Sequence, residues 1–427
     1  MNIKLGKPIL VHAPEMNSAV ARWGVYAIPR MWRERMGELV IRFNGEADST
    51  VPETMQAAPN LYFVSRDEGK TWARDPDGEQ HYDISILTGI EPPCLRLRNG
   101  DLVYLQYEKD LPPVENTPWQ KEFEFPNHDS YMRTYRYGDI PDACKKLWFC
   151  RVDGKTGELT RREAVLDFPE RELALNYLGR EGDEFVPVPE YVQPYIFASP
   201  YISAMHELPD GTLCALSHGQ NPEVHDRYCK EIYLMVSEDG GGTWKKRATA
   251  ASSAEMPFGY GGDAGECSLA MMEDGSLFCV MRMDMSIHPD EDETKCWGTA
   301  FCASFDGGFT WMEPKLISDS SVTPHITAHG DKLLVIYGRP GVHCIASCDR
   351  GETWSESVPI IGKTLSEERA LGRKDSDSKY FASCSYSNTF VEQLAPDTVL
   401  VCYNDQTYPD KNGVPTKACF VRTITVK

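Results

Sequence analysis

Hydrophobic and polar positions recur along this chain as short apolar strands joined by polar turns. Six segments share one order: an apolar strand, a turn that often contains Asp-Gly, and a second apolar strand. A polar turn between two apolar runs of strand length is typical of a β-hairpin. The sequence therefore predicts six hairpins, which begin at Tyr26, Pro92, Ser199, Gly265, Val322 and Ser385.

A second repeat follows four of these hairpins and obeys the pattern S-x-D-x-G-x-T-W. Its copies are SRDEGKTW at 65–72, SEDGGGTW at 237–244, SFDGGFTW at 304–311 and SCDRGETW at 347–354. Aspartate accepts hydrogen bonds from turn amides, and glycine adopts a backbone angle that other residues resist. We expect the four aspartates to serve the turn and the tryptophan to anchor it in the core. A degenerate relative, LWFCRVDGKTGEL at 147–159, follows the second hairpin.

An inner hairpin followed by an outer hairpin gives four antiparallel strands per unit. Six such units predict an all-β chain that forms a six-bladed β-propeller, with residues 1–427 as one domain. The last unit lacks outer-strand material, and the N-terminal segment IKLGKPILVHA is expected to pair with the C-terminal strand. Long insertions at about 108–146 and 167–198 are expected to cover the site face, with disorder as the alternative.

The net charge of −20 argues against nucleic acid or an anionic membrane as the main partner. No apolar run approaches the length that spans a bilayer, and the N-terminus lacks a signal-peptide pattern, so a cytoplasmic location is expected. The 14 cysteines mostly stand singly in apolar runs. They lack the paired spacing of a zinc site, so we expect no metal and no cofactor.

The turns and hairpins together resemble the sialidase (neuraminidase) superfamily, whose six-bladed propellers carry BNR repeats, also called aspartate boxes. The resemblance covers essentially the whole chain. It implies a tyrosine nucleophile paired with a glutamate, an aspartic general acid, and three arginines that hold the substrate carboxylate. By this resemblance the nucleophile is Tyr386, its partner is Glu266, and the second arginine is Arg282.

The chemistry explains why such a pair is needed. Sialic acid carries a carboxylate on its anomeric carbon, which repels an anionic nucleophile, whereas a neutral phenol deprotonated during attack avoids this repulsion. Tyrosine has an unperturbed pKa near 10 and therefore needs a neighbouring base. A tyrosine nucleophile is a known exception to the usual pair of carboxylates in glycosidases.

The remaining positions of the family pattern are less fixed. Arg339 is the expected third arginine, and His325 at the start of the fifth hairpin is expected to reach the site. The general acid is expected to be Asp48, with Glu46 and Glu53 as alternatives, since spacing alone does not choose between them. A catalytic acid needs a raised pKa, which partial burial provides.

One departure stands at the first hairpin. The superfamily signature reads aromatic-Arg-Ile-Pro, whereas this chain reads Tyr-Ala-Ile-Pro from Tyr26, so Ala27 replaces the arginine. Arg30 lies three residues later, and strand alternation predicts that it faces the opposite side from Ala27 unless a local bend restores the charge. The departure leaves open whether the sugar is sialic acid or another acidic or neutral sugar.

These observations predict a retaining exo-glycosidase that removes a terminal sugar, such as sialic acid, from a glycan. One alternative is a propeller lyase acting on a uronic acid, in which His325, His218 or His206 would abstract a proton. A second is a glycan-binding propeller without catalysis, because a fold does not fix a function. The sequence does not predict the oligomeric state.

Overall fold

The computed structural model is all-β, with strands joined by turns and two short 3-10 helices among the residues it describes. The described residues are 2–13, 27–34, 37–44, 61–77, 94–108, 110–125, 130–181, 183–192, 205–225, 229–254, 263–284, 297–319, 322–338, 341–363, 367, 370–371, 386–409, 413 and 415–427. Within these ranges, no helix has the length and apolarity needed to cross a membrane.

Two compact units make up the chain. The first combines Met1–Asp83 with Ser318–Lys427, and the second is Ile84–Ile317. The single domain expected from the sequence stays a prediction.

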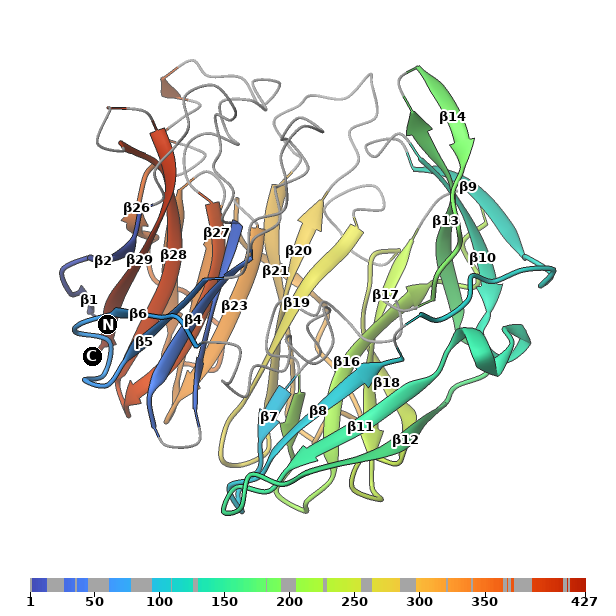
Figure 1. Cartoon of the computed structure of the whole chain (residues 1–427), viewed down its shortest axis with the longest axis horizontal. Helices are drawn as coiled ribbons and strands as arrows, with labels where there is room; N and C mark the ends of the chain where they lie inside the picture. The colour runs from blue at the N-terminus through green and yellow to red at the C-terminus, as the bar shows by residue number, and fades with distance from the viewer. Residues whose placement is uncertain are drawn as a thin grey trace. The chain divides into compact units, whose positions relative to one another are not determined.

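The first unit contains three sheets, shown in Figure 1 from blue at the N-terminus to red at the C-terminus. One sheet runs in chain order through β3 (Ala27–Arg33), β4 (Leu39–Asn44), β5 (Leu61–Ser65) and β6 (Ala73–Asp75). Another runs through β23 (Val322–His329), β24 (Lys332–Gly338), β25 (Val342–Ser347) and β26 (Val358–Ile361). The third contains β27 (Tyr386–Ala395), β28 (Thr398–Pro409), β29 (Pro415–Val426), β1 (Ile3–Leu5) and β2 (Ile9–His12).

The third sheet joins the two ends of the chain. Ile3 lies opposite Val426 on β29, and Ile9 lies opposite Val421 of the same strand. Val421 and Val426 are buried, so this pairing covers an apolar edge that would otherwise be open. The expected pairing of the N-terminal segment with the C-terminal strand is confirmed.

The second unit contains a sheet of four strands and a sheet of twelve. The first runs through β19 (Asp263–Met271), β20 (Leu277–Asp284), β21 (Trp297–Ser304) and β22 (Lys315–Ser318). The twelve-stranded sheet includes two sets of four strands, joined by the parallel pairing of β12 with β18. The first set is β7 (Cys94–Arg96), β8 (Leu102–Tyr107), β11 (Leu147–Val152) and β12 (Leu159–Asp167). The second set is β15 (Met205–Glu207), β16 (Leu213–Gln220), β17 (Lys230–Ser237) and β18 (Thr243–Ser252).

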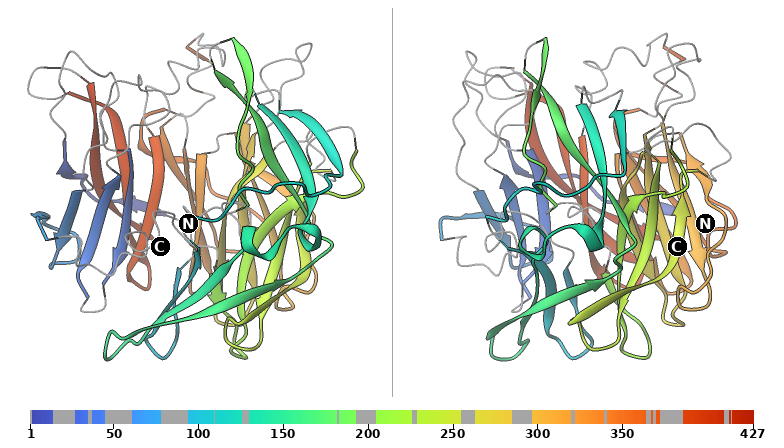
Figure 2. Two further views of the ribbon diagram at one scale, coloured as in Figure 1. Left: turned by 45° about the vertical axis from the view of Figure 1, so that its right-hand side comes forward. Right: turned by 90° about the vertical axis from the view of Figure 1, so that its right-hand side faces the viewer.

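The two long insertions supply the remaining strands of the twelve-stranded sheet. Residues 108–146 contain β9 (Lys121–Phe125), β10 (Ser130–Arg136) and the 3-10 helices η2 (Tyr137–Asp139) and η3 (Asp142–Cys144). Residues 167–198 contain β13 (Glu172–Glu181) and β14 (Glu184–Pro187). The order β9-β10-β13-β14 places strands from both insertions side by side, as Figure 2 shows. The insertions therefore form a sheet extension; that they cover the site face stays a prediction.

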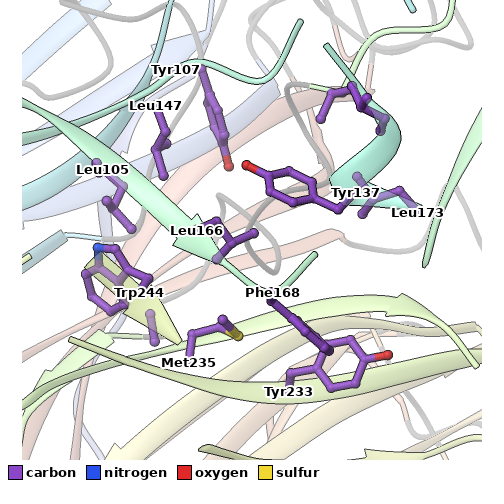
Figure 3. Packing of buried hydrophobic residues seen from close by; sticks show 14 of the residues in the cluster. Leu105, Tyr107, Tyr137, Leu147, Leu166, Phe168, Leu173, Tyr233, Met235 and Trp244 are labelled. Atoms are coloured by element: carbon purple, nitrogen blue, oxygen red, sulfur yellow. The ribbon is translucent and has the colours of Figure 1, made fainter. Parts of the chain in front are cut away.

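A large apolar cluster of the second unit includes the tryptophan of the turn at 237–244. It packs Leu105 of β8 and Leu166 of β12 against Met235 of β17, and it encloses Trp244, which has no exposed surface (Figure 3). Strands buried on both faces read as continuous apolar runs, which is why the period-2 alternation is weak in this sequence. The expected anchoring of this turn by its tryptophan is confirmed.

The four S-x-D-x-G-x-T-W turns share one set of hydrogen bonds. In the turn at 237–244, Ser237 donates to Asp239 Oδ1 at 2.8 Å, and the Thr243 amide donates to the same oxygen at 2.9 Å. The Gly241 amide donates to Ser237 Oγ at 2.7 Å. Equivalent bonds form at Asp67, Asp306 and Asp349. The aspartates serve their turns, as the sequence predicts.

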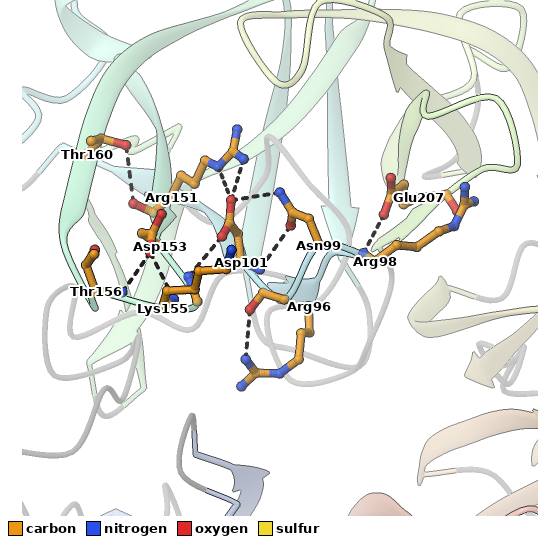
Figure 4. A network of polar contacts seen from close by, with 12 residues as sticks. Arg96, Arg98, Asn99, Asp101, Arg151, Asp153, Lys155, Thr156, Thr160 and Glu207 are labelled. Carbon is orange, nitrogen blue, oxygen red and sulfur yellow. Dashed lines mark hydrogen bonds and ion pairs between the residues drawn. The ribbon is translucent and has the colours of Figure 1, made fainter.

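The degenerate turn after the second hairpin keeps part of this chemistry. Asp153 Oδ1 accepts the amides of Lys155 and Thr156 at 2.9 and 2.7 Å. Beside it, Asp101 accepts Arg151 Nε at 2.6 Å and the Gly154 amide at 2.9 Å, which ties the β7–β8 turn to the β11–β12 turn (Figure 4). These contacts satisfy turn amides, so this acidic cluster is structural.

Candidate functional site

The first strand of four hairpins has an irregular register near its start. The shifts lie between Ala27 and Arg30 in β3, between Ala264 and Cys267 in β19, between Val322 and His325 in β23, and between Tyr386 and Phe390 in β27. A bulge breaks the alternation of a strand and re-aims side chains, and bulges are enriched beside active sites. A predicted site residue lies in or at the edge of each shift: Arg30, Glu266, His325 and Tyr386.

Glu266 lies within the shift of β19, and Arg282 lies on the neighbouring strand. Ala264 pairs with Met283 and Cys267 pairs with Met281, so Arg282 stands opposite the irregular residues. Arg282 Nη1 donates to Glu266 Oε2 at 3.1 Å. The structure thus brings together the two residues that the family pattern places in this hairpin.

Both side chains of this pair are partly open to solvent. Arg282 is 20% exposed and Glu266 is 22% exposed, whereas Met281, Met283 and Cys267 around them are buried. A carboxylate and a guanidinium held at the rim of an apolar core are less screened than surface charges. The pair has the groups needed to accept a proton and to bind an anionic group of a ligand.

The first unit holds Arg30 and a residue that the sequence reasoning missed. Arg30 of β3 lies opposite Arg42 of β4, and both are buried, at 7% and 5% exposed. Like charges directly opposite each other in a sheet are unfavourable, so two buried arginines are unusual at this position. Arg42 interrupts the apolar run LVIRF, which is the signal that would have identified it.

The register shift also changes the argument about Arg30. Strict alternation would place Arg30 and Ala27 on opposite faces, but the shift falls between these two residues. The alternation argument is therefore wrong across this interval. The local irregularity that the sequence left as the alternative is present.

His325 and Tyr386 lie on strands that neighbour one another in the first unit. β27 packs beside both β3 and β23. His325 is buried, and its backbone pairs with Ile336. Tyr386 is the first residue of β27, and its backbone lies opposite Asn404. The roles expected for the two side chains stay predictions.

Asn404 is a second residue that the sequence reasoning missed. It is 1% exposed, and its Oδ1 has no hydrogen-bond partner in the part of the chain that the structure describes. A buried acceptor left unpaired costs about 1–3 kcal/mol. A buried polar group without a partner calls for an explanation, and the backbone of Asn404 lies opposite that of Tyr386.

Several predicted residues lie outside the described residues. They are Asp48, its alternatives Glu46 and Glu53, and Arg339.

The histidines of the lyase alternative lie within the described residues. His206 Nε2 donates to the Leu269 carbonyl at 2.7 Å, and burial lowers the pKa of this histidine. Burial, with Lys230 and Arg171 nearby, lowers the pKa of His218 well below its ordinary value.

No cluster of three or more His, Cys, Asp or Glu residues suited to a metal occurs in the described ranges. Cys348 is exposed and Cys344 is buried, and both are free thiols.

Residues 201–387 match the family model of the BNR repeat-like domain. This range includes Glu266, Arg282, His325 and Tyr386. The resemblance to BNR-repeat proteins, predicted from the turns, is therefore confirmed. No curated protein matches this chain in sequence.

Solved structures match nearly the whole chain. A protein of unknown function from Dyadobacter fermentans DSM 18053 is 15% identical, with 100% of this chain and 99% of that chain covered and a TM-score of 0.53. An α-L-arabinanase from Penicillium chrysogenum, complexed with arabinobiose, is 13% identical, with 98% of each chain covered and a TM-score of 0.50. The Hadza microbial sialidase Hz136 is 15% identical, with 93% of this chain and 65% of that chain covered and a TM-score of 0.48.

At identities this low the first two matches show the fold. The chain shares the all-β fold of these two structures, and the residues described form repeated antiparallel sheets. A closed ring and a count of six blades stay predictions.

Proposed function

We propose that this protein is a glycosidase that removes a terminal, acidic sugar from a glycan. The observation that carries the proposal is the repeated register shift at the start of β3, β19, β23 and β27, with a chemically suited residue at each. Residues at strand ends and in loops carry binding and catalysis more often than core positions do. The arabinanase with the same fold was solved with a disaccharide, which supports a sugar as the ligand class.

In this proposal the Glu266–Arg282 pair provides the polar groups of the second unit. Arg282 binds the acidic group of the sugar, since a guanidinium fork matches a carboxylate with two parallel N–H···O bonds. Glu266 accepts a proton during the reaction.

The retaining mechanism assigns attack on the anomeric carbon to Tyr386, and leaving-group protonation to Asp48. Both assignments rest on the resemblance to sialidases, and each is tested by its own substitution. A phenylalanine at 386 removes only the hydroxyl, and an asparagine at 48 removes only the ionisable proton. Turnover kept by Tyr386→Phe would exclude a tyrosine nucleophile.

A panel of chromogenic glycosides tests the proposal. The purified protein is assayed with α-sialosides, glucuronides and galacturonides, and the released aglycone is measured. The proposal predicts turnover of at least one acidic glycoside and its loss in Glu266→Gln. A new ultraviolet-absorbing unsaturated product would indicate a lyase instead. Binding of acidic glycans without any product would indicate a glycan-binding protein.

A second candidate function is hydrolysis of an arabinose-containing glycan. It is favoured by the fold match to the arabinanase and by Ala27, which stands where sialidases keep an arginine. Release of nitrophenol from an α-L-arabinofuranoside, together with inactivity on every acidic glycoside, would favour this candidate over the first.

A further inference from the structure

Arg133 of β10 lies between two aromatic rings on the sheet extension formed by β9, β10, β13 and β14. Its Cζ is 3.8 Å from the centroid of the Tyr177 ring and 5.2 Å from the centroid of the Trp119 ring. A guanidinium over aromatic faces is held by cation–π attraction and by stacking. Both rings therefore lie within cation–π range of the guanidinium.

Glu122 forms an ion pair with the same guanidinium. Arg133 Nε donates to Glu122 Oε2 at 3.2 Å, from the strand directly opposite. Burial and a hydrogen bond to Glu122 raise the pKa of Tyr177 to about 12, so its hydroxyl stays a donor. The guanidinium carries five N–H groups, and this ion pair uses the one on Nε. Tyr135 also lies near the guanidinium. The side chain of Arg133 remains 30% exposed.

An open aromatic surface surrounds this arginine. Trp119 is 47% exposed and Phe185 of β14 is 42% exposed. Tyr131 contacts Tyr177 edge-on at 6.4 Å between centroids and Phe185 at 5.0 Å. Large aromatic side chains that stay exposed next to one another indicate a binding surface more than a core.

Buried residues anchor both faces of the extension. On the face away from Arg133 these are Phe123 of β9 and Met132 and Thr134 of β10. On the face of Arg133, Leu173 and Leu175 of β13 belong to the large apolar cluster of the second unit. Trp119 and Phe185 nevertheless keep 47% and 42% of their surface exposed.

We propose that this surface is a second carbohydrate site, in which Arg133 binds the carboxylate of an acidic sugar and Trp119 packs against the sugar ring. A guanidinium beside aromatic rings suits a sugar that carries one carboxylate. The guanidinium of Arg133 would bind the carboxylate, and an aromatic face would contact the C–H groups of the sugar ring. The net charge of −20 opposes a polyanion here. The choice of an acidic glycan rests on the proposed function, since such a site would bind a sugar unit of the same substrate other than the one that is cleaved off.

The test is binding of 3′-sialyllactose and of galacturonic acid to the full chain, measured by calorimetry and by saturation-transfer NMR, with lactose as the neutral probe. Wild type, Trp119→Ala, Arg133→Gln and Arg133→Lys are compared. Phe309→Ala is the matched control, because Phe309 is 64% exposed and lies under Arg247 at 4.6 Å in the same unit. We expect binding of the acidic probes to weaken at least tenfold in Trp119→Ala and Arg133→Gln and to be unchanged in Phe309→Ala.

Repeating the titrations in an Arg282→Ala background separates this proposal from the proposed function. Acidic-sugar binding that persists with Arg282→Ala and disappears on adding Arg133→Gln supports the second site, whether or not the protein hydrolyses a glycoside. Binding that is indifferent to both Arg133→Gln and Trp119→Ala, equal binding of lactose, or no binding of either acidic probe would overturn it. Because Trp119 is nearly half exposed, Trp119→Ala is expected to keep the wild-type melting temperature, which excludes unfolding as the cause.

Discussion

Arg282 donates a hydrogen bond of 3.1 Å to Glu266 from the strand that pairs with the irregular part of β19. The register shift lies where a carboxylate and a guanidinium meet beside the buried residues Met281, Met283 and Cys267. The aspartates of the repeated turns differ from this pair, because their oxygens accept the amides of their own turns. The proposed function therefore assigns substrate chemistry to the pair and stability to the turns.

Replacing Arg282 by lysine is expected to lower kcat/KM on an acidic glycoside by about 10- to 100-fold. Lysine keeps the charge but loses the planar fork, and hydrogen bonds to charged groups are worth about 1.5–3 kcal/mol. Steady-state kinetics measure the effect. Arg247→Lys is the control, since Arg247 donates to the Gly307 carbonyl at 2.8 Å away from the candidate site. Equal kcat/KM in all three proteins would remove Arg282 from substrate binding.

Acid is expected to weaken the fold through the turn aspartates. Hydrogen bonds from the threonine of each turn, through its hydroxyl or its amide, lower the pKa of Asp67, Asp306 and Asp349 to about 2. A lowered pKa contributes stability that is fully present above the unfolded pKa of about 3.9 and is lost as the pH falls towards 2. Urea unfolding between pH 2 and pH 6 measures this loss.

The control for the acid effect is Asp349→Asn, which keeps an acceptor oxygen but does not titrate. Its urea midpoint is expected to depend less steeply on pH between 4 and 2 than that of wild type. Identical slopes for the two proteins would show that this turn does not contribute to acid sensitivity.

Substituting the glycine of a repeated turn is expected to destabilise the protein through packing as well as backbone strain. Gly241 has a φ of +101°, and an added Cβ would lie 2.3 Å from Phe149 Cε2. Overpacking of this kind costs about 1–3 kcal/mol, in addition to about 1–2 kcal/mol for the left-handed backbone. Thermal and urea unfolding of Gly241→Ala measure the total.

Gly100→Ala separates the two contributions. Gly100 has a φ of +94°, and an added Cβ would meet nothing within 4 Å. Its alanine variant is therefore expected to show the backbone cost alone. If Gly241→Ala were no less stable than Gly100→Ala, the close contact with Phe149 would have no energetic consequence.

Asn404→Leu is expected to separate stability from activity. The buried Oδ1 of Asn404 has no hydrogen-bond partner among the residues described, so an apolar group of similar size should leave the free energy of unfolding unchanged or raise it by up to about 1–3 kcal/mol. We expect turnover to fall in the same variant. Lower stability with normal turnover would instead identify Asn404 as a structural residue.

The local features of the fold could be predicted from the sequence. The turn repeat follows from Ser, Asp, Gly and Thr residues that share the same hydrogen bonds within each eight-residue turn, and the hairpin predicted from Val322 begins there as β23. The pairing of β10 with β13 could not be predicted, because it joins two insertions through contacts distant in sequence. The register shifts could not be predicted either, because a run of apolar residues has the same sequence pattern whether or not the strand contains a bulge. The buried polar residues Arg42 and Asn404 were missed because each stands within a strand that is otherwise apolar.

Catalysis by Glu266 and Tyr386 is tested by aglycone release from an acidic glycoside, measured side by side for wild type, Glu266→Gln and Tyr386→Phe. We expect turnover by wild type and a loss of at least 100-fold in each variant, with melting temperatures unchanged, because general base catalysis alone contributes about 10²–10⁴-fold. Wild-type rates in both variants would contradict catalysis by these two residues.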